Sequence, residues 1–258
     1  MATRLISQPF TFDEDDWHAW HRGRTEYASS PTGPTALTAN HWVEPDKPAS
    51  ALEYPDTPGR WYRTTDRLIG LDIPRTHSVT GTVQLAAGES VSDGSLSIQA
   101  FERQGEFAVR IYNRHAPNRI AFHSIEAFVP SSRWALPARL SPDADTVNLT
   151  TSDGTILPTP TLGWLHFEMG NLSHRLRVIG QGGKIWTAFS DESSAIGVHR
   201  FRFIKLDRPD ATGYTVIDFN RAYLPSVAFS KHFLSPMPTP TNTLEFSVEA
   251  GEKWAVFN

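Results

Sequence analysis

The stretch SLSIQAFERQGEFAVRIY, which spans residues 95–112, decides the fold class of this chain. Its two arms, 95–101 and 106–112, are rich in the β-branched and aromatic residues that favour β-strands. Between the arms lies Arg103-Gln104-Gly105, and a glycine in so short a connection is typical of a hairpin turn. The stretch therefore predicts a β-hairpin.

Short apolar segments of the same kind occur on both sides of this hairpin. They lie at 68–71, 82–86, 120–128, 135–140, 146–150, 163–168, 175–179, 186–190, 200–206, 215–219 and 244–248. Their spacing of about 8–14 residues, with turn residues between them, favours a sandwich or barrel over alternating strand–helix units. We therefore expect a mainly β chain that forms an antiparallel β-barrel or β-sandwich.

One helix is predicted near the N-terminus. Thr11-Phe12-Asp13-Glu14 has the form of a capping box, in which a hydroxyl and a carboxylate stand three residues apart. The spacing then places four residues on one helix face, namely Trp17, Trp20, Arg24 and Tyr27. The sequence predicts an amphipathic helix at 13–29, which ends before Pro31 and Gly33.

The stretch 30–66 separates this helix from the regular strands. It contains six prolines, at positions 31, 34, 45, 48, 55 and 58, and only short apolar pieces. Its embedded tryptophans and tyrosines indicate that it packs on the protein instead of linking two domains. We therefore expect a single domain over 1–258, with a wrapping segment at 30–66 and a β body at 67–250.

The composition excludes several classes of protein. Of the 258 residues, 39% are hydrophobic and 20% are charged, which is typical of a globular chain and not of a disordered one. The chain has no cysteine, so thiol catalysis, cysteine zinc sites and iron–sulfur clusters are excluded. A net charge of −4 argues against nucleic-acid binding. With no signal peptide and no long apolar run, we expect a cytoplasmic protein that does not bind membranes.

Standard catalytic motifs are absent, and two local clusters have a simpler interpretation. The glycine-rich segment 180–184 precedes a strand-like run, so a tight hairpin is favoured over an anion-binding loop. His18 and His21 have a spacing that suits a metal, but no nearby carboxylate completes a ligand set. We predict solvated or packing histidines, no metal site and no cofactor.

The densest polar cluster, Asp218-Phe219-Asn220-Arg221-Ala222-Tyr223, follows a predicted strand. Polar side chains at the end of a strand are well placed to line the mouth of a cavity. Asp218 is the candidate general acid or base, and Asn220, Arg221 and Tyr223 are candidate ligand-binding residues. The alternative is a structural network in which Asp218 pairs with an arginine and fixes the loop.

Three further residues are candidates for the same site. His41 and His123 are candidate second proton carriers for a catalytic Asp218, although the sequence places neither histidine near it. Trp42 is a candidate ligand-binding aromatic residue.

The run 216–229, with the sequence VIDFNRAYLPSVAF, resembles the signature of the domain-of-unknown-function family 1684 of bacteria and archaea. A proline-rich stretch, Asn242, Leu244 and the closing Glu249-Ala250-Gly251-Glu252 follow in the same register. Similar blocks lie upstream at 32–42, 108–111 and 128–139. The resemblance covers nearly the whole chain, and it implies no particular activity.

Departures from the family pattern fall at specific positions. Val227 and Ser235 stand where the family usually has cysteines, and Leu224 stands where it has asparagine. The block 191–197 is also altered. Roles that rest on those residues are not expected in this divergent, cysteine-free member.

Three functions are compatible with these patterns. The first is a protein that binds a small polar or mixed organic ligand in a cavity near Asp218–Tyr223. The second is a cofactor-independent hydrolase, lyase or isomerase that uses Asp218 as general acid or base. The third is an interaction module that docks through the proline-rich segment 236–240 and forms a homo-oligomer.

Overall fold

The computed structural model of the chain describes residues 12–74 and 81–258. By internal contacts the chain divides into two compact units. Unit 1 comprises Met1–Thr25, His123–Ala228 and Leu234–Val256, and unit 2 comprises Glu26–Phe122, Phe229–Phe233 and Phe257–Asn258. The single domain expected over 1–258 stays a prediction, because this division records internal contacts and not independent folding.

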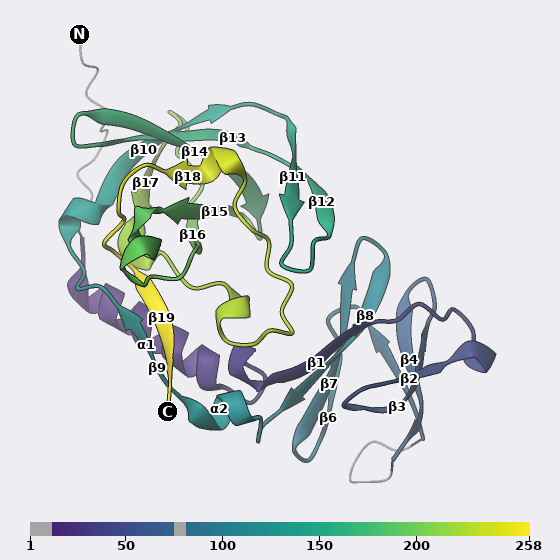
Figure 1. Cartoon of the computed structure of the whole chain (residues 1–258). Helices are drawn as coiled ribbons and strands as arrows, with labels where there is room; N and C mark the ends of the chain where they lie inside the picture. Colours follow the sequence, from purple (N-terminus) through teal and green to yellow (C-terminus); the bar gives the residue numbers. More distant parts are fainter. Residues whose placement is uncertain (1–11, 75–80) are drawn as a thin grey trace. The chain divides into compact units, whose positions relative to one another are not determined.

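Unit 1 is built on a curved sheet that forms half of a barrel (Figure 1). The strand order is β16-β15-β14-β13-β10-β17, with β18 paired to β15. Neighbours along this path are antiparallel, whereas β18 runs parallel to β15. These strands are β10 (Ala135–Pro142), β13 (Gly163–Met169), β14 (Leu172–Gln181), β15 (Lys184–Asp191), β16 (Arg202–Leu206), β17 (Tyr214–Asp218) and β18 (Thr243–Leu244).

Two smaller strand pairs complete the sheet structure of this part of the chain. They are β11 (Thr146–Thr150) with β12 (Ile156–Pro160), and β9 (Phe122–Ala127) with β19 (Glu252–Phe257). The core lies against the inner face of the half-barrel, because alternate residues of each strand point inward and are apolar. Among these core residues are Ala138, Leu165, Phe167, Leu176, Val178, Ile217 and Phe219.

Unit 2 contains two four-stranded sheets that share one hydrophobic core. The first has the order β1-β8-β7-β6, and the second has the order β2-β3-β4-β5. Their bounds are β1 (Leu37–Trp42), β2 (Leu52–Tyr54), β3 (Thr57–Arg63), β4 (Arg67–Ile73), β5 (Gly81–Ala86), β6 (Ser90–Asp93), β7 (Leu96–Arg103) and β8 (Glu106–Asn113). The chain is therefore mainly β and antiparallel, which confirms the predicted fold class.

The hairpin predicted at 95–112 is confirmed as β7 and β8. Arg103 pairs with Glu106, and the two residues between them have positive φ, 55° at Gln104 and 84° at Gly105. Two positive φ angles make the turn that matches the twist of an antiparallel pair. The hairpin predicted at 180–184 is also confirmed, with Gln181 paired to Lys184 and positive φ at both intervening glycines.

The stretch 30–66 is more regular than its prolines predict, because it contains β1, β2 and β3. Pro34 and Pro48 each start a short 3-10 helix, and Pro55 lies between β2 and β3. These three prolines therefore lie outside the strands, where their fixed φ and missing N–H are tolerated, whereas Pro58 lies near the start of β3. Likewise, the strand predicted at 120–128 begins only at Phe122, because the short helix α2 (Pro117–Ala121) precedes it.

The helix predicted at 13–29 is confirmed as α1 (Glu14–Ser29). Thr11, the predicted capping residue, lies outside the described residues. Asp13 caps the helix instead, since its Oδ1 accepts the N–H of Asp16 at 3.1 Å. Trp17 is buried, and its indole N–H donates to the Asn220 carbonyl at 2.7 Å. No described helix combines the length and the apolar character needed to cross a membrane.

The segment 249–252 packs against the loop that follows β17. The N–H of Glu252 donates to the Ala222 carbonyl at 2.8 Å, and the N–H of Phe128 donates to the Gly251 carbonyl at 3.0 Å. Gly251 has φ of +77°, and a Cβ there would lie 2.5 Å from the Ala222 carbonyl oxygen. Glycine is therefore required at this position both for its conformation and for the close approach.

A buried arginine holds the residues just before this glycine. Arg202 is 0% exposed, and it donates to the carbonyls of Ala250 and Val248 at 2.5 and 2.9 Å. Its charge is balanced by Asp191, whose Oδ2 lies 2.7 Å from Nη2. A buried ion pair of this kind is costly to break, because removing one partner leaves an uncompensated charge.

We expect Gly251→Ala to destabilise the chain by about 2–4 kcal/mol, because the new methyl group meets the Ala222 carbonyl and the positive φ is strained. Urea unfolding measures the change. Gly170→Ala is the matched control, since Gly170 also has positive φ but has nothing within 4 Å of its ideal Cβ. Equal losses in the two variants would show that the close approach contributes nothing.

Candidate functional site

The Asp218–Tyr223 motif is shaped by a short 3-10 helix. β17 ends at Asp218, whose Oδ1 accepts the N–H of Asn220 at 3.0 Å and so caps the helix η5 (Phe219–Arg221). The tight turn sends Phe219 into the core, where it is 0% exposed, while Asp218 and Arg221 stay partly exposed. The middle of the motif, Phe219 and Asn220, therefore points inward, while Asp218 and Arg221 on either side stay partly exposed.

Asn220 is fully buried and makes only structural contacts. Its Oδ1 accepts the N–H of Ser131 at 2.9 Å, and its Nδ2 donates to the Ser131 carbonyl at 3.0 Å and to Asp218 Oδ1 at 2.8 Å. With every amide donor and acceptor engaged, Asn220 fixes the loop to the segment before β10.

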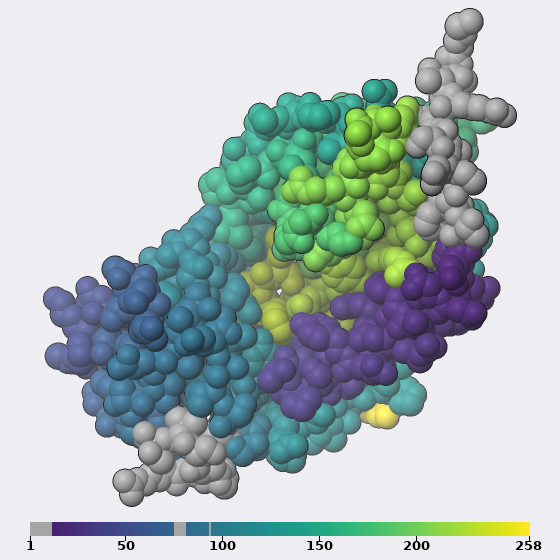
Figure 2. Space-filling view, turned by 180° about the vertical axis from the view of Figure 1, so that it is seen from behind, coloured from purple at the N-terminus to yellow at the C-terminus, as the bar shows by residue number. Residues whose placement is uncertain are grey.

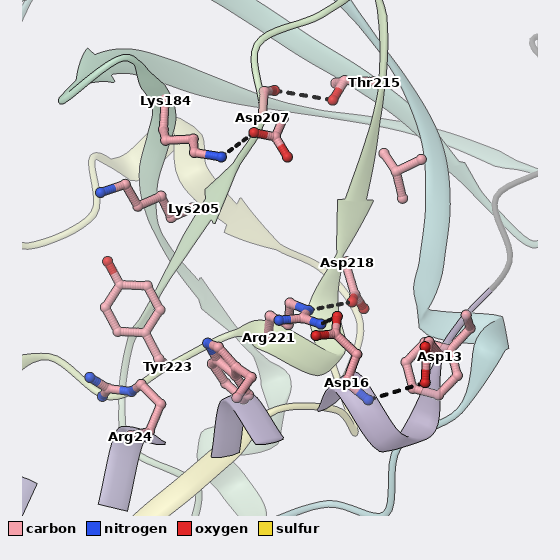
Figure 3. Close-up of a pocket in the computed structure, with 13 residues that line it drawn as sticks. Asp13, Asp16, Arg24, Lys184, Lys205, Asp207, Thr215, Asp218, Arg221 and Tyr223 are labelled. Carbon is pink, nitrogen blue, oxygen red and sulfur yellow. Dashed lines mark hydrogen bonds and ion pairs between the residues drawn. The ribbon is translucent and has the colours of Figure 1, made fainter. Parts of the chain in front are cut away.

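A cavity of about 830 Å³ opens beside the partly exposed residues of the motif (Figure 3). Helix α1, strands β15 to β17 and the loop after β17 contribute to its wall. It is lined by Phe12, Asp13, Asp16, Trp20, Arg24, Lys184, Lys205, Asp207, Thr215, Val216, Asp218, Arg221 and Tyr223. All of these residues belong to unit 1.

Most of the charges on this wall are paired within the protein. Arg221 forms ion pairs with Asp16 and with Asp218, the latter at 3.4 Å. Lys184 pairs with Asp207. Lys205 is exposed and has no ion-pair partner among residues 12–74 and 81–258. The wall therefore offers one unpaired ammonium group beside three paired cations.

Arg24 links the cavity wall to a buried carboxylate. Its guanidinium donates to both oxygens of Glu252, at 2.7 and 3.0 Å, and it lies 4.9 Å from the ring centroid of Tyr223. The Tyr223 hydroxyl accepts the indole N–H of Trp186 at 3.1 Å. In Figure 3 this hydroxyl points toward Lys205. Tyr223 is thus held in place by Arg24 and Trp186.

Burial raises the pKa of Asp218 above its ordinary value, and the hydrogen bonds from Asn220 and the charge of Arg221 oppose this shift. Burial also raises the pKa of Tyr223, so its hydroxyl stays protonated at neutral pH. The cavity therefore presents a carboxyl group that takes up a proton more readily than usual and a phenol that keeps its proton.

The structure brings together three of the residues predicted for the site, Asp218, Arg221 and Tyr223. Asn220 belongs to the motif but does not line the cavity. His123 is exposed on β9 and does not line it either.

His41 and Trp42 lie in unit 2 on β1. His41 Nε2 lies 2.9 Å from the Pro55 carbonyl, and its ring stacks on Tyr54. Trp42 packs on Phe101, with ring centroids 5.9 Å apart.

Sequence reasoning predicted three of the thirteen residues that line the cavity and missed the other ten. Asp16, Trp20 and Arg24 lie on α1, and the helical spacing of Trp20 and Arg24 was a usable signal, since residues four apart share a face. No sequence pattern pointed to Lys184, Lys205 and Asp207, because only the pairing of β15 with β16 brings these lysines together.

The two histidines of α1 are packing and surface residues in the structure. The His21 ring stacks on Trp17, with centroids 5.1 Å apart, and burial lowers its pKa. His18 lies 3.7 Å from Glu14. Within residues 12–74 and 81–258, no three histidine, aspartate or glutamate side chains are grouped as metal ligands.

The proline-rich segment 236–240 packs on its own unit. The N–H of Met237 donates to the Thr150 carbonyl at 2.8 Å, and Pro236 forms a β-bridge with Thr151. This segment is therefore held beside β11.

A comparison with protein-family models supports the family resemblance that was inferred from the Asp218–Tyr223 motif. The family model described as "Protein of unknown function (DUF1684)" matches residues 120–253. The chain belongs to this DUF1684 family. The match includes Asp218, Arg221 and Tyr223, whereas helix α1 lies outside it. No curated protein matches the chain.

Among the solved structures that resemble part of this DUF1684 protein is the NMR structure of an uncharacterised protein from Haloarcula marismortui, with a TM-score of 0.42 and 27% identity. The similarity covers 51% of this chain and 77% of the other.

The raised pKa of Asp218 predicts how stability depends on pH. The folded chain holds this proton more tightly than the unfolded chain, so the stabilisation is present below pH of about 4 and is lost as the pH rises through the folded pKa. Asp218→Asn removes this titration. The free energy of unfolding of the variant, relative to the parent, should therefore increase with pH over that interval.

Urea unfolding at several pH values measures this difference, and NMR titration of the Asp218 carboxyl carbon measures the pKa directly. A carboxyl pKa below the usual value, or a relative stability that falls with pH, would contradict the prediction.

Proposed function

We propose that this DUF1684 protein binds a small polar or mixed organic ligand in the cavity beside Asp218–Tyr223. The observation that carries the proposal is the cavity itself, with a volume of about 830 Å³ and three motif residues on its wall. Ligand sites in proteins commonly have volumes of about 300–1,000 Å³ and combine apolar walls with a few oriented polar groups.

The chemistry of the wall supports a ligand of mixed character. Phe12, Trp20, Val216 and the ring of Tyr223 provide apolar surface. The four basic and four acidic lining residues largely balance one another, and most of them are already paired. A highly charged polyanion or polycation is therefore disfavoured, and a small molecule with both apolar and hydrogen-bonding parts is favoured.

A blocked cavity tests the proposal. A panel of amino acids, organic acids, amines, sugars and nucleosides is screened by thermal shift against the parent and against Val216→Trp, whose larger ring narrows the cavity. A ligand at ten times its Kd adds about 1.4 kcal/mol of stability, which corresponds to a shift of about 3–6 °C. We expect such a shift in the parent and its loss in Val216→Trp.

Val129→Trp is the matched control, because Val129 belongs to the same unit and is 84% exposed. It should bind the same compounds as the parent. If no compound binds the parent, or if Val216→Trp binds as well as the parent does, the cavity is not the ligand site.

Catalysis by Asp218 is the second candidate function. Its partly buried carboxyl, with a raised pKa and Arg221 at 3.4 Å, suits general acid or base chemistry of a hydrolase, lyase or isomerase. Neither His41 nor His123 lines this cavity, so Tyr223 replaces them as the candidate second proton carrier.

Asp218→Asn separates the two functions once a compound binds. If the protein only binds, the variant keeps affinity and the parent leaves the compound unchanged over hours of incubation. If Asp218 transfers a proton, the parent converts the compound and the variant loses most of this turnover, by about 100-fold or more. Full turnover in Asp218→Asn would exclude the catalytic role.

A further inference from the structure

A second set of polar and aromatic residues lies on the outer face of one sheet of unit 2. In the register of β1, β8 and β7, Asn40 pairs with Arg110 and Arg110 pairs with Gln99. Neighbouring residues such as Ala39 and Val109 belong to the core of this unit. Because side chains alternate along strands, the row that contains Arg110 faces away from that core.

Arg110 is half-buried and packs among aromatic rings. Its Cζ lies 3.5 Å from the ring centroid of Phe101 and 5.5 Å from that of Phe233. At 3.5 Å the guanidinium plane must lie nearly flat on the Phe101 ring, because an upright orientation would push a nitrogen into the ring. The ring therefore covers the face of the guanidinium and leaves the N–H groups on its edge.

The N–H groups on the edge of this guanidinium have few hydrogen-bond acceptors within the protein. Nε donates to Asn40 Oδ1 at 3.3 Å, and the Tyr112 hydroxyl is the other hydrogen-bonding neighbour. An arginine carries five N–H donors, so these two groups do not satisfy all of them. Burial lowers the pKa of Arg110.

Two other arginines, unlike Arg110, each have a buried carboxylate partner. Arg24 faces Glu252 and Arg202 faces Asp191, each at 2.7 Å. Arg110 has no ion-pair partner within the part of the chain that the structure describes. A guanidinium taken out of water without a counter-charge is unfavourable, and an anion that arrives from solvent relieves this cost.

We propose that Arg110 anchors a binding site for the oxyanion of a small organic acid, with the apolar part of the ligand against Trp42 and Phe233. A guanidinium edge matches a carboxylate or a phosphate through two parallel N–H···O bonds.

Arg103 adds positive charge beside this site. Its Cζ lies 4.7 Å from the Trp42 ring, which in turn packs on Phe101. The site lies wholly in unit 2 and is separate from the cavity of unit 1.

The test uses the full chain with benzoate and phenyl phosphate as anionic probes and benzyl alcohol as the neutral one. Binding is followed by calorimetry and by the NMR signal of the Arg110 Nε–H. We expect saturable binding of at least one anion at millimolar Kd or tighter, with a shift of that signal, and at least tenfold weaker binding of benzyl alcohol. The tighter of the two anions identifies the preferred oxyanion.

Asn40→Asp is the decisive variant. It places a carboxylate where an oxygen already accepts from Arg110 Nε, so an internal counter-ion competes with the probe. The variant should stay folded and bind both anions at least tenfold more weakly. Gln84→Glu changes the net charge equally on the exposed face of β5 in the same unit, and it should bind like the parent.

Arg110→Gln should also bind both anions more weakly. If Arg110→Gln fails to fold, Asn40→Asp alone tests the proposal. Val216→Trp should leave these affinities unchanged, which separates this site from the cavity of unit 1. The proposal is overturned if neither anion saturates, if Asn40→Asp binds them like the parent, or if Gln84→Glu weakens them as much as Asn40→Asp does.

Discussion

The carboxylate of Glu252 is the group on which unit 1 depends. It is 0% exposed, and its oxygens accept two hydrogen bonds from Arg24 and one from the N–H of Leu224 at 2.7 Å. A buried carboxylate without these donors would be costly, so helix α1, the loop after β17 and strand β19 are held in one arrangement. Because Trp20 shares helix α1 with Arg24, the same constraint sets one wall of the cavity.

The Asp218–Tyr223 motif contributes residues both to the protein core and to the cavity wall. Phe219 and Asn220 point inward, where they fill the core and fix the Ser131 segment, while Asp218 and Arg221 face the cavity. The structural network therefore lies on one side of this turn, and the proposed ligand site lies on the other. The N–H of Val227 donates to Ser235 Oγ at 3.2 Å, so the two positions at which the resemblance implies cysteines are neighbours in space.

Local patterns predicted the elements better than the site. The hairpin at 95–112 and helix α1 were predictable because turn glycines, capping acids and alternating apolar residues act over a few positions. The strands within 30–66 were missed, because the six prolines of this stretch suggested irregular structure. Most of these prolines lie at turns, and the segments between them pair as strands, β1 with the distant β8 and β2 with its neighbour β3. In the site, Asp218, Arg221 and Tyr223 are close in sequence, whereas Lys205 joins them only through the sheet.

The sequence by itself determined that this chain is a cysteine-free, mainly β protein with one N-terminal helix and a polar motif at the end of a strand. Those features follow from composition and from short-range periodicity. Only the tertiary structure decided that Asn220 is structural, that Trp20 and Arg24 line one cavity with Asp218 and Tyr223, and that Arg110 has no carboxylate partner among residues 12–74 and 81–258. The physical reason is that burial and charge pairing depend on strand register and on helix docking, which join residues far apart in the sequence.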